Sequence, residues 1–363
     1  MTALPLEGIR VLDLSRVLAG PLCSMLLGDL GANVIKVERP GAGDETRGWG
    51  PPFDERGESA YFLSTNRNKR SLTADLDAPG DAQLVRALIA DADVVIENFL
   101  PGVLSRKSID AERLLLANTR LIWCSILGYR NQPNRPGYDF AVQAESGWMS
   151  VTGEPQGAPV KTAVALIDVL TGKDAAIAIL AALVQRRPRT AAERLLTVTL
   201  EGSAAAALVN VAQNTLVSGK EPTRWGNAHA NLVPYQLFET ADRPLVIAVG
   251  SDRQWLALAN VLGDAALQTD ESLRTNAGRV VNRARCVQAV QHVLRSAPAT
   301  IWESRCRDAG VPVGRVRGVL EALRDIGASP LTGVPSSVGG VLRRPPPLLG
   351  EHTAEIKLHG WGA

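Results

Sequence analysis

Several features that would assign this 363-residue chain to a particular class of protein are missing. Its 39 basic residues nearly balance its 37 acidic ones, and a net charge of +2 gives no broad field for nucleic acid or an anionic membrane. No apolar run approaches the length of a membrane span, and the first residues have no signal-peptide core. We therefore expect a cytoplasmic protein that binds neither nucleic acid nor membrane.

Cysteine pairs are missing as well. The chain has four cysteines, far apart and never in a C-x-x-C pair: Cys23, Cys124, Cys286 and Cys306. This spacing argues against a structural zinc or a disulfide framework and suits a reducing compartment. What the chain does have is 45% hydrophobic and 21% charged residues, which is typical of a folded globular protein with a large core.

The first forty residues predict a strand, a helix and a second strand. An apolar run at 9–14 is followed by a loop, a helical pattern at 22–30 and a second apolar run at 33–38. This βαβ spacing predicts a parallel sheet. The theme recurs with a helical pattern at 84–89 and further strands at 94–96, 121–126 and 195–200. Residues 175–184 are apolar nearly all round and predict a central, buried helix.

The pattern changes after residue 200. Residues 201–224 are Ala-rich and then polar, which indicates a helix running into a linker. Two apolar runs at 235–240 and 245–249 flank turn residues and predict an antiparallel hairpin, and Ser251 is placed to cap the next helix. We expect a large domain from 1–200 and 305–363, and a small domain from 225–304.

A βαβ unit with Glu38 at its end raises the possibility of dinucleotide binding. Such binding needs a G-x-G-x-x-G loop, so that the backbone can approach the pyrophosphate. The loop here, Ser15-Arg-Val-Leu-Ala-Gly-Pro21, has one glycine and places Val17 and Leu18 where phosphates would lie. NAD is therefore not expected.

Several blocks in this chain resemble the class III CoA-transferases, the superfamily of formyl-CoA transferase, carnitine CoA-transferase and α-methylacyl-CoA racemase. The blocks follow the family's order over nearly the whole chain: residues 8–21, 30–40, 66–71, 92–99, 135–139, 165–172, 226–229, 250–255 and 349–352. Residues 137–139 and 165–168 look most like the succinyl-CoA-dependent dicarboxylate branch. The resemblance implies a Rossmann-like α/β large domain, with a parallel sheet built from both chain ends, a small α+β domain and an interlocked homodimer.

The resemblance also implies transfer of CoA from an acyl-CoA to a carboxylic acid, without metal or NAD. The family's nucleophile is an aspartate before a buried helix, and Asp168 matches it. The same position equally suits an aspartate that only caps the helix. The matching positions for CoA binding are Leu18, Ala19, Arg39, Ala74, Asn98, Phe99, Leu100, Arg106 and Arg135. Arg39 and Arg106 both follow parallel strands, at the edge where α/β sheets bind ligands.

The racemase branch offers an alternative with the same fold. It uses a histidine–aspartate pair, and its histidine lies where this chain has Tyr138, followed by Asp139. Tyrosine ionises near pH 10 and histidine near 6.5, so a tyrosine is a poor base at neutral pH. Of the remaining histidines, His229 in the small domain is the candidate to line the site, and a purely structural role suits it equally. Tyr138, Asp139 and His229 are therefore expected to support the site.

Two departures from the family bear on the substrate. The stretch 227–235 lacks the glycine run that covers the site of formyl-CoA transferase, which argues against formate or oxalate. The loop at 127–134 is shorter than in many relatives and has lost most of its glycines. A third hypothesis is therefore a protein that binds CoA but has lost catalytic activity.

Overall fold

The computed structural model describes residues 3–185 and 189–362 and divides into two units. The first unit contains residues 1–149, 161–221 and 329–363, and the second contains 150–160 and 222–328. The small domain was expected to end at residue 304. The second unit extends further because β9 (Val313–Arg315) pairs with β8 (Leu245–Ala248), which holds the chain in the small sheet beyond that point.

A six-stranded parallel sheet forms the centre of the first unit, in the order β3-β2-β1-β4-β5-β6. Its strands are β1 (Arg10–Asp13), β2 (Asn33–Glu38), β3 (Lys69–Thr73), β4 (Val94–Glu97), β5 (Ile122–Leu127) and β6 (Leu195–Thr199). This order is that of the Rossmann fold, and the strand order reverses between β1 and β4. The parallel sheet is confirmed. The expectation that both chain ends build it is wrong, because all six strands lie between residues 10 and 199.

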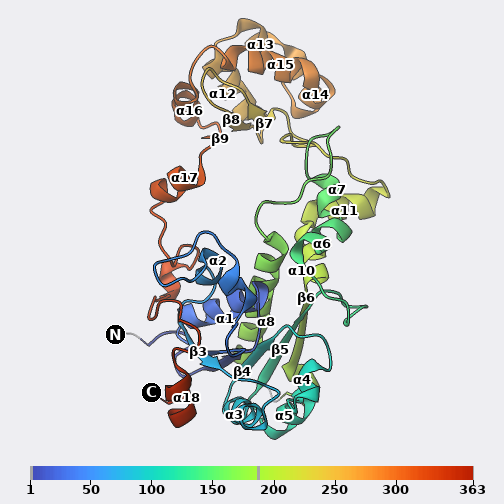
Figure 1. Cartoon of the computed structure of the whole chain (residues 1–363). Coiled ribbons are helices and arrows are strands. Elements are labelled where there is room, and N and C mark those ends of the chain that lie inside the picture. Colours follow the sequence, from blue (N-terminus) through green and yellow to red (C-terminus); the bar gives the residue numbers. More distant parts are fainter. Residues whose placement is uncertain (1–2, 186–188, 363) are drawn as a thin grey trace. The chain divides into compact units, whose positions relative to one another are not determined.

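Helices cover both faces of this sheet (Figure 1). On one face α1 (Ala19–Asp29) packs against α8 (Leu166–Val184), and Gly172 allows this close approach because a Cβ there would lie 2.6 Å from the Ala19 carbonyl oxygen. On the other face lie α3 (Pro79–Ala90) and α5 (Ala111–Ala117). The remaining elements are η1 (Glu45–Gly48), α2 (Ala60–Leu63), α4 (Val103–Arg106), α6 (Asp139–Glu145), α7 (Trp148–Val151, across the unit boundary), α9 (Ala191–Arg194), α10 (Leu200–Ala207), α11 (Val209–Ser218), η3 (Ser336–Val338) and α18 (Thr353–His359).

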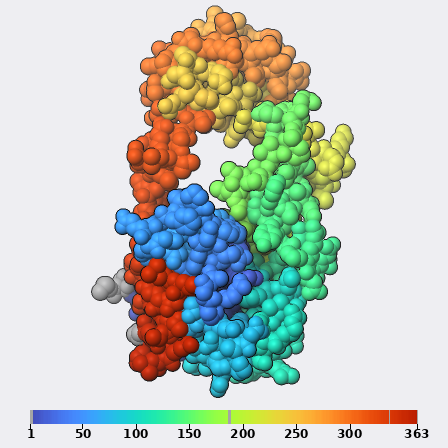
Figure 2. Space-filling model, in the orientation of Figure 1, coloured from blue at the N-terminus to red at the C-terminus, as the bar shows by residue number. Residues whose placement is uncertain are grey.

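The C-terminal segment joins the first unit through a helix. The N–H of Ser71 in β3 donates to His352 at 3.3 Å, the N–H of Thr73 donates to Thr353 at 3.0 Å, and Ile356 of α18 is fully buried. Figure 2 shows the red C-terminal residues lying against the blue and cyan N-terminal part of this unit. The chain therefore returns to the large unit after the small one.

The second unit is a small α+β domain with an antiparallel sheet in the order β7-β8-β9. The predicted hairpin is confirmed as β7 (Tyr235–Phe238) and β8, and Ser251 caps α12 by accepting the N–H of Gln254. Its core combines the sheet with α12 (Asp252–Leu262), α13 (Ala265–Thr269), η2 (Glu271–Leu273), α14 (Asn276–Val281), α15 (Arg283–Leu294) and α16 (Ala299–Asp308), followed by α17 (Val319–Asp325). The predicted linker at 201–224 is largely helical, as α10 and α11.

Candidate active site

The candidate site lies where the strand order reverses, at the carboxyl ends of β1 and β4. In open α/β sheets this crevice is where ligands bind. The loops that follow the two strands are joined there: the Arg16 N–H donates to Asn98 Oδ1 at 3.0 Å, and Asn98 Nδ2 donates to the Arg16 carbonyl at 2.7 Å. The single glycine of the first loop, Gly20, is needed because a Cβ there would lie 2.2 Å from Ser15 Oγ.

Two adjoining cavities open along this crevice. One, of about 270 Å³, is lined by the loop after β1, the loop after β4, residues 133 and 135–138, and Asp168. We call it the Asp168 cavity. The other, of about 260 Å³, is lined by Arg39, Ala74 and the ends of β1 and β2, and we call it the Arg39 cavity. Arg16 and Phe99 line both, so the two cavities lie side by side.

Asp168 lies in the first turn of α8, with its side chain partly exposed to the Asp168 cavity. Burial disfavours its negative charge, and the nearby Asp139 carboxylate adds repulsion. Together they raise the pKa of Asp168 from 3.8 to about 7. A carboxylate with such a pKa is a stronger base and nucleophile than an ordinary aspartate, and it ionises near neutral pH.

The side chain that caps the start of α8 is that of Asp139, and not that of Asp168. Asp139 Oδ1 accepts the N–H groups of Ile167 at 2.8 Å and Asp168 at 3.3 Å, and its Oδ2 accepts Gln143 Nε2 at 2.6 Å. Ala165, at the N-cap position, makes no side-chain capping bond. The helix start is therefore satisfied by a residue from α6, and the Asp168 carboxylate is left to face the cavity.

The structure gathers most of the predicted site residues in these two cavities. The Asp168 cavity is lined by Leu18, Ala19, Asn98, Phe99, Leu100, Arg135, Tyr138 and Asp168, and the Arg39 cavity by Arg39, Ala74 and Phe99. Arg106 ends the short helix α4, is exposed, and lines neither cavity. His229 belongs to the second unit, where its Nδ1 accepts the N–H of Asn231 at 3.0 Å, and its part in the site stays a prediction.

The shortened loop after β5 is well packed and lines one side of the Asp168 cavity. Gly128 and Gly137 pack backbone to backbone, since a Cβ on Gly128 would lie 2.6 Å from the Gly137 Cα. Arg135 stacks on the Tyr129 ring at 4.2 Å and forms a close ion pair with Glu145. These contacts keep Pro133, Arg135 and Tyr138 at the cavity in spite of the lost glycines.

Two cations at the crevice were missed by the sequence analysis. Arg16 lines both cavities, stacks on the Phe99 ring at 5.1 Å and lies 3.5 Å from Glu45. Lys107, directly after α4, lines the Arg39 cavity and pairs with Asp77 at 2.5 Å. Arg16 lies three residues after β1, and that position was the available signal; Lys107 follows α4 and had no such signal. Across 3–185 and 189–362 no cluster of three or more His, Cys, Asp or Glu side chains is arranged to hold a metal.

Fold and crevice thus define an α/β enzyme with a partly buried carboxylate at the end of an extended ligand cavity, and comparison with known proteins identifies its class. The chain belongs to CoA-transferase family III, whose model matches residues 6–353. It is accordingly an enzyme, a family III CoA-transferase that uses CoA thioesters.

Individual relatives are similar over nearly the whole chain. The chain is 41% identical to a succinyl-CoA:glutarate CoA-transferase of Mus musculus, over 97% of this chain and 85% of that protein. It is 40% identical to a succinate–glutarate CoA-transferase of Agrobacterium fabrum, over 97% and 94%. Among solved structures, a CAIB/BAIF family protein from Brucella suis is similar with a TM-score of 0.86 and 39% identity, over 98% of this chain and 99% of that one.

Proposed function

We propose that this enzyme moves CoA between succinyl-CoA and a second carboxylic acid, with Asp168 as the covalent nucleophile. The observation that carries this proposal is the placement of the Asp168 carboxylate in the cavity at the sheet's switch point, together with its raised pKa. The two relatives named as succinate or succinyl-CoA and glutarate transferases support a dicarboxylate as donor and acceptor. The crevice continues into the Arg39 cavity, which offers cations for the CoA phosphates.

The reaction proceeds by exchange of one activated acyl bond for another. The Asp168 carboxylate attacks the succinyl thioester carbonyl, which forms a mixed anhydride and releases the CoA thiolate. The thiolate then attacks the aspartyl carbonyl, which forms an Asp168–CoA thioester and releases succinate. The acceptor carboxylate attacks this thioester and again releases the thiolate, which attacks the acceptor's acyl carbon and regenerates the Asp168 carboxylate. No atom is gained or lost overall, and water must be kept from the anhydride.

Each cavity has its own task in this scheme. Arg39 and Lys107 hold phosphates of the nucleotide end in the Arg39 cavity, and Arg16 lies where the chain of CoA crosses to the Asp168 cavity. Leu18 and Ala19, at the start of α1, line the Asp168 cavity, and no group among the described residues accepts a hydrogen bond from their backbone N–H groups. They are suited to the oxyanion that forms on the thioester carbonyl.

The proposal is tested by exchange and by trapping. The enzyme is incubated with succinyl-CoA and a mixed pool of carboxylic acids that includes glutarate, and mass spectrometry identifies which acids gain CoA. Hydroxylamine added during turnover should convert residue 168 into a hydroxamate, because it intercepts the anhydride or the aspartyl thioester. Wash-in of α-deuterium without any exchange would instead indicate racemisation, and CoA binding without either would indicate an inactive protein.

The proposal extends to assembly and location. We propose an interlocked homodimer in the cytoplasm, supported by exposed apolar side chains on α11, where Leu216 is 79% and Val217 78% exposed. No helix within 3–185 and 189–362 is long and apolar enough to cross a membrane. Light scattering coupled to gel filtration should give twice the chain mass of 38.6 kDa, and a mass of one chain would contradict the homodimer.

The pKa of Asp168 predicts how turnover depends on pH. With the pKa at about 7, kcat/KM for succinyl-CoA should fall about tenfold per pH unit below 7 and level off above it, because only the carboxylate attacks. Asp139→Asn removes the neighbouring negative charge and should move the inflection down by roughly one unit. Glu97→Gln is the matched control: burial raises the pKa of Glu97, but it lies outside the Asp168 cavity, and the inflection should stay. An unmoved inflection in Asp139→Asn would contradict the assignment.

Arg39 should contribute affinity for the nucleotide part of CoA alone. Arg39→Gln is expected to weaken CoA binding roughly 10- to 100-fold, because it removes a charge-assisted hydrogen bond to phosphate. Titration calorimetry measures the change, and transfer from succinyl-pantetheine, which lacks the nucleotide, should be unaffected. Arg120→Gln, an exposed arginine away from both cavities, is the control. Equal losses with CoA and pantetheine substrates would refute this role.

A further inference from the structure

The loop after β1 has an unusual backbone conformation at Val17. Its φ is +73°, in the left-handed region that β-branched residues rarely adopt. A residue in this conformation is strained and requires support from its surroundings. Val17 immediately precedes Leu18 and Ala19, which line the Asp168 cavity. Its conformation therefore sets the direction of the peptides that face the ligand.

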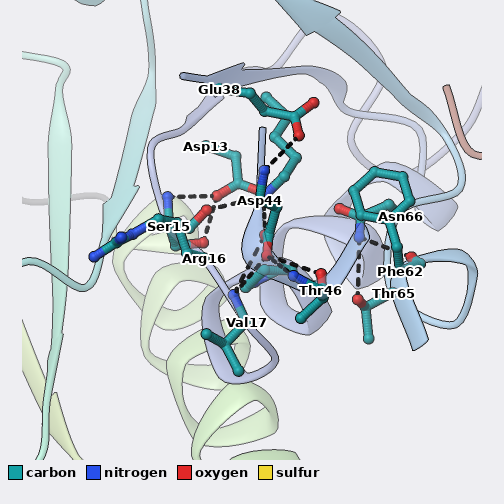
Figure 3. A network of polar contacts seen from close by, with 12 residues as sticks. Asp13, Ser15, Arg16, Val17, Glu38, Asp44, Thr46, Phe62, Thr65 and Asn66 are labelled. Carbon is teal, nitrogen blue, oxygen red and sulfur yellow. Dashed lines mark hydrogen bonds and ion pairs between the residues drawn. The ribbon is translucent and has the colours of Figure 1, made fainter. Parts of the chain in front are cut away.

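Asp44 supports this conformation directly. The Val17 N–H lies 3.3 Å from each Asp44 carboxylate oxygen (Figure 3). Asp44 Oδ1 also caps η1, accepting the Thr46 N–H at 3.0 Å and the Thr46 hydroxyl at 2.8 Å. Its Oδ2 lies 2.9 Å from Lys36 Nζ, and both side chains of this ion pair are fully buried. Asp44 is thus fixed on two sides and holds the loop on a third.

Two buried lysines fix the ends of the same loop. Lys36 Nζ donates to the Ser15 carbonyl at 2.9 Å, and Lys69 Nζ donates to the Pro21 carbonyl at 2.9 Å. The loop is therefore held at Ser15, Val17 and Pro21 by charged groups with no exposed surface or almost none. Between Val17 and Pro21, Leu18, Ala19 and Gly20 make no such contact with the network, and the first two line the cavity.

We propose that Asp44, fixed by Lys36, is a positioning residue that holds Val17 in its left-handed conformation and so directs the Leu18 and Ala19 N–H groups at the acyl-CoA. This inference rests on the proposed function of the Asp168 cavity. Asp44 and Lys36 are among the residues around the Arg39 cavity, but both side chains are fully buried, so Asp44 acts through the Val17 backbone. Without its carboxylate, Val17 relaxes to a negative φ and the next peptides turn away from the cavity.

Glycine at position 17 provides the decisive test, because glycine adopts positive φ without steric penalty. We expect Asp44→Asn to lower kcat/KM for transfer from succinyl-CoA to glutarate about 30- to 100-fold and to weaken CoA binding, as misplaced binding groups do. In Asp44→Asn/Val17→Gly the loss relative to Val17→Gly alone should shrink to about fivefold or less. Ser108, exposed after α4, also has a positive φ of 61°, so Asp44→Asn/Ser108→Gly is the matched control and should not recover.

The outcomes separate positioning from support of the fold. If Asp44 only supports the fold, Asp44→Asn should lower activity and thermal stability together, and Val17→Gly should restore neither. That result would overturn the proposal. Recovery with Ser108→Gly as well would also overturn it, since it would indicate general stabilisation. Should Asp44→Asn not fold, Lys36→Met/Asp44→Asn, which removes the buried cation too, is measured with and without Val17→Gly. A wild type that binds CoA without transferring it defeats the proposed function, while CoA affinity in the same variants still tests the positioning role. A wild type that binds no CoA overturns both.

Discussion

Asp168→Asn is expected to abolish CoA exchange and at the same time to make the protein more stable above pH 7. Exchange should fall by about ten-thousand-fold or more, because an amide cannot form the anhydride and removal of a covalent nucleophile is among the most damaging substitutions in an enzyme. CoA binding should persist, since the contacts of the Arg39 cavity are untouched.

The gain in stability follows from the same pKa. Asp168 has a folded-state pKa of about 7 against 3.8 for a free carboxyl, so its ionised form is disfavoured in the folded chain. The contribution of Asp168 to the free energy of unfolding of the wild type is fully present below pH 4, where the carboxyl is protonated, and is lost as the pH rises through 7. Asparagine avoids that loss. The variant should equal wild type near pH 4 and exceed it above pH 7, by about 1–3 kcal/mol after allowance for partial exposure.

Melting temperatures from pH 4 to 9, together with label exchange between succinate and succinyl-CoA, provide the measurement. Asp174→Asn is the matched control on the same helix, because Asp174 accepts the Ser203 hydroxyl at 2.6 Å and does not line the Asp168 cavity. It should retain exchange within about threefold. An Asp168→Asn enzyme that still transfers CoA would remove the covalent mechanism, and one that loses stability above pH 7 would contradict the raised pKa.

Apolar periodicity was sufficient to predict most of the large sheet. Residues 33–38 form β2 as expected, and β4, β5 and β6 lie within one or two residues of the predicted strands. β3, with the sequence KRSLT, was not predicted. Its Lys69 and Arg70 look like solvent-exposed residues in the sequence, but both are buried, since Lys69 pairs with Asp13 at 3.1 Å and Arg70 with Glu355 at 2.7 Å. Those partners lie 56 and 285 residues away, beyond the reach of local pattern.

The residues that line the candidate site could be predicted from family motifs, but the contacts that hold those residues in place could not. Family motifs located Asp168 and the loops after β1 and β4, which the structure brings to one crevice. They did not predict that α8 begins at Leu166, well before the apolar run, since the carboxylate that caps it comes from Asp139. Nor did they predict the left-handed Val17 or its contact with Asp44, 27 residues away. Such contacts exist only in the folded chain.

The buried charges behind the loop should dominate the stability of the first unit. Asp13 is fully buried and accepts hydrogen bonds from Ser15, from Ser24 at 2.5 Å and from Lys69 at 3.1 Å. Burial disfavours its charge, yet Lys69 and Lys36 outweigh that effect and lower the pKa of Asp13 to about 2. Asp13→Asn leaves two buried ammonium groups short of negative charge, and this should destabilise the fold by about 3–5 kcal/mol and lower Tm by roughly 5–15 °C.

Thermal melts of three variants test this claim. Lys357→Met breaks the exposed Lys357–Asp81 pair of 3.2 Å in the same unit and should change Tm by no more than about 2 °C. Asp13→Asn/Lys69→Met removes both charges and should recover at least part of the lost stability.

The loss of stability in Asp13→Asn should also depend on pH. Burial lowers the pKa of Lys69 to about 8, and without Asp13 this pKa falls further, so Lys69 loses its proton at a lower pH in Asp13→Asn. The difference in Tm between Asp13→Asn and wild type should therefore become smaller as the pH rises to about 8. A gap that does not change with pH, or a double variant less stable than Asp13→Asn, would show that the loss of stability comes from packing and not from unpaired charge.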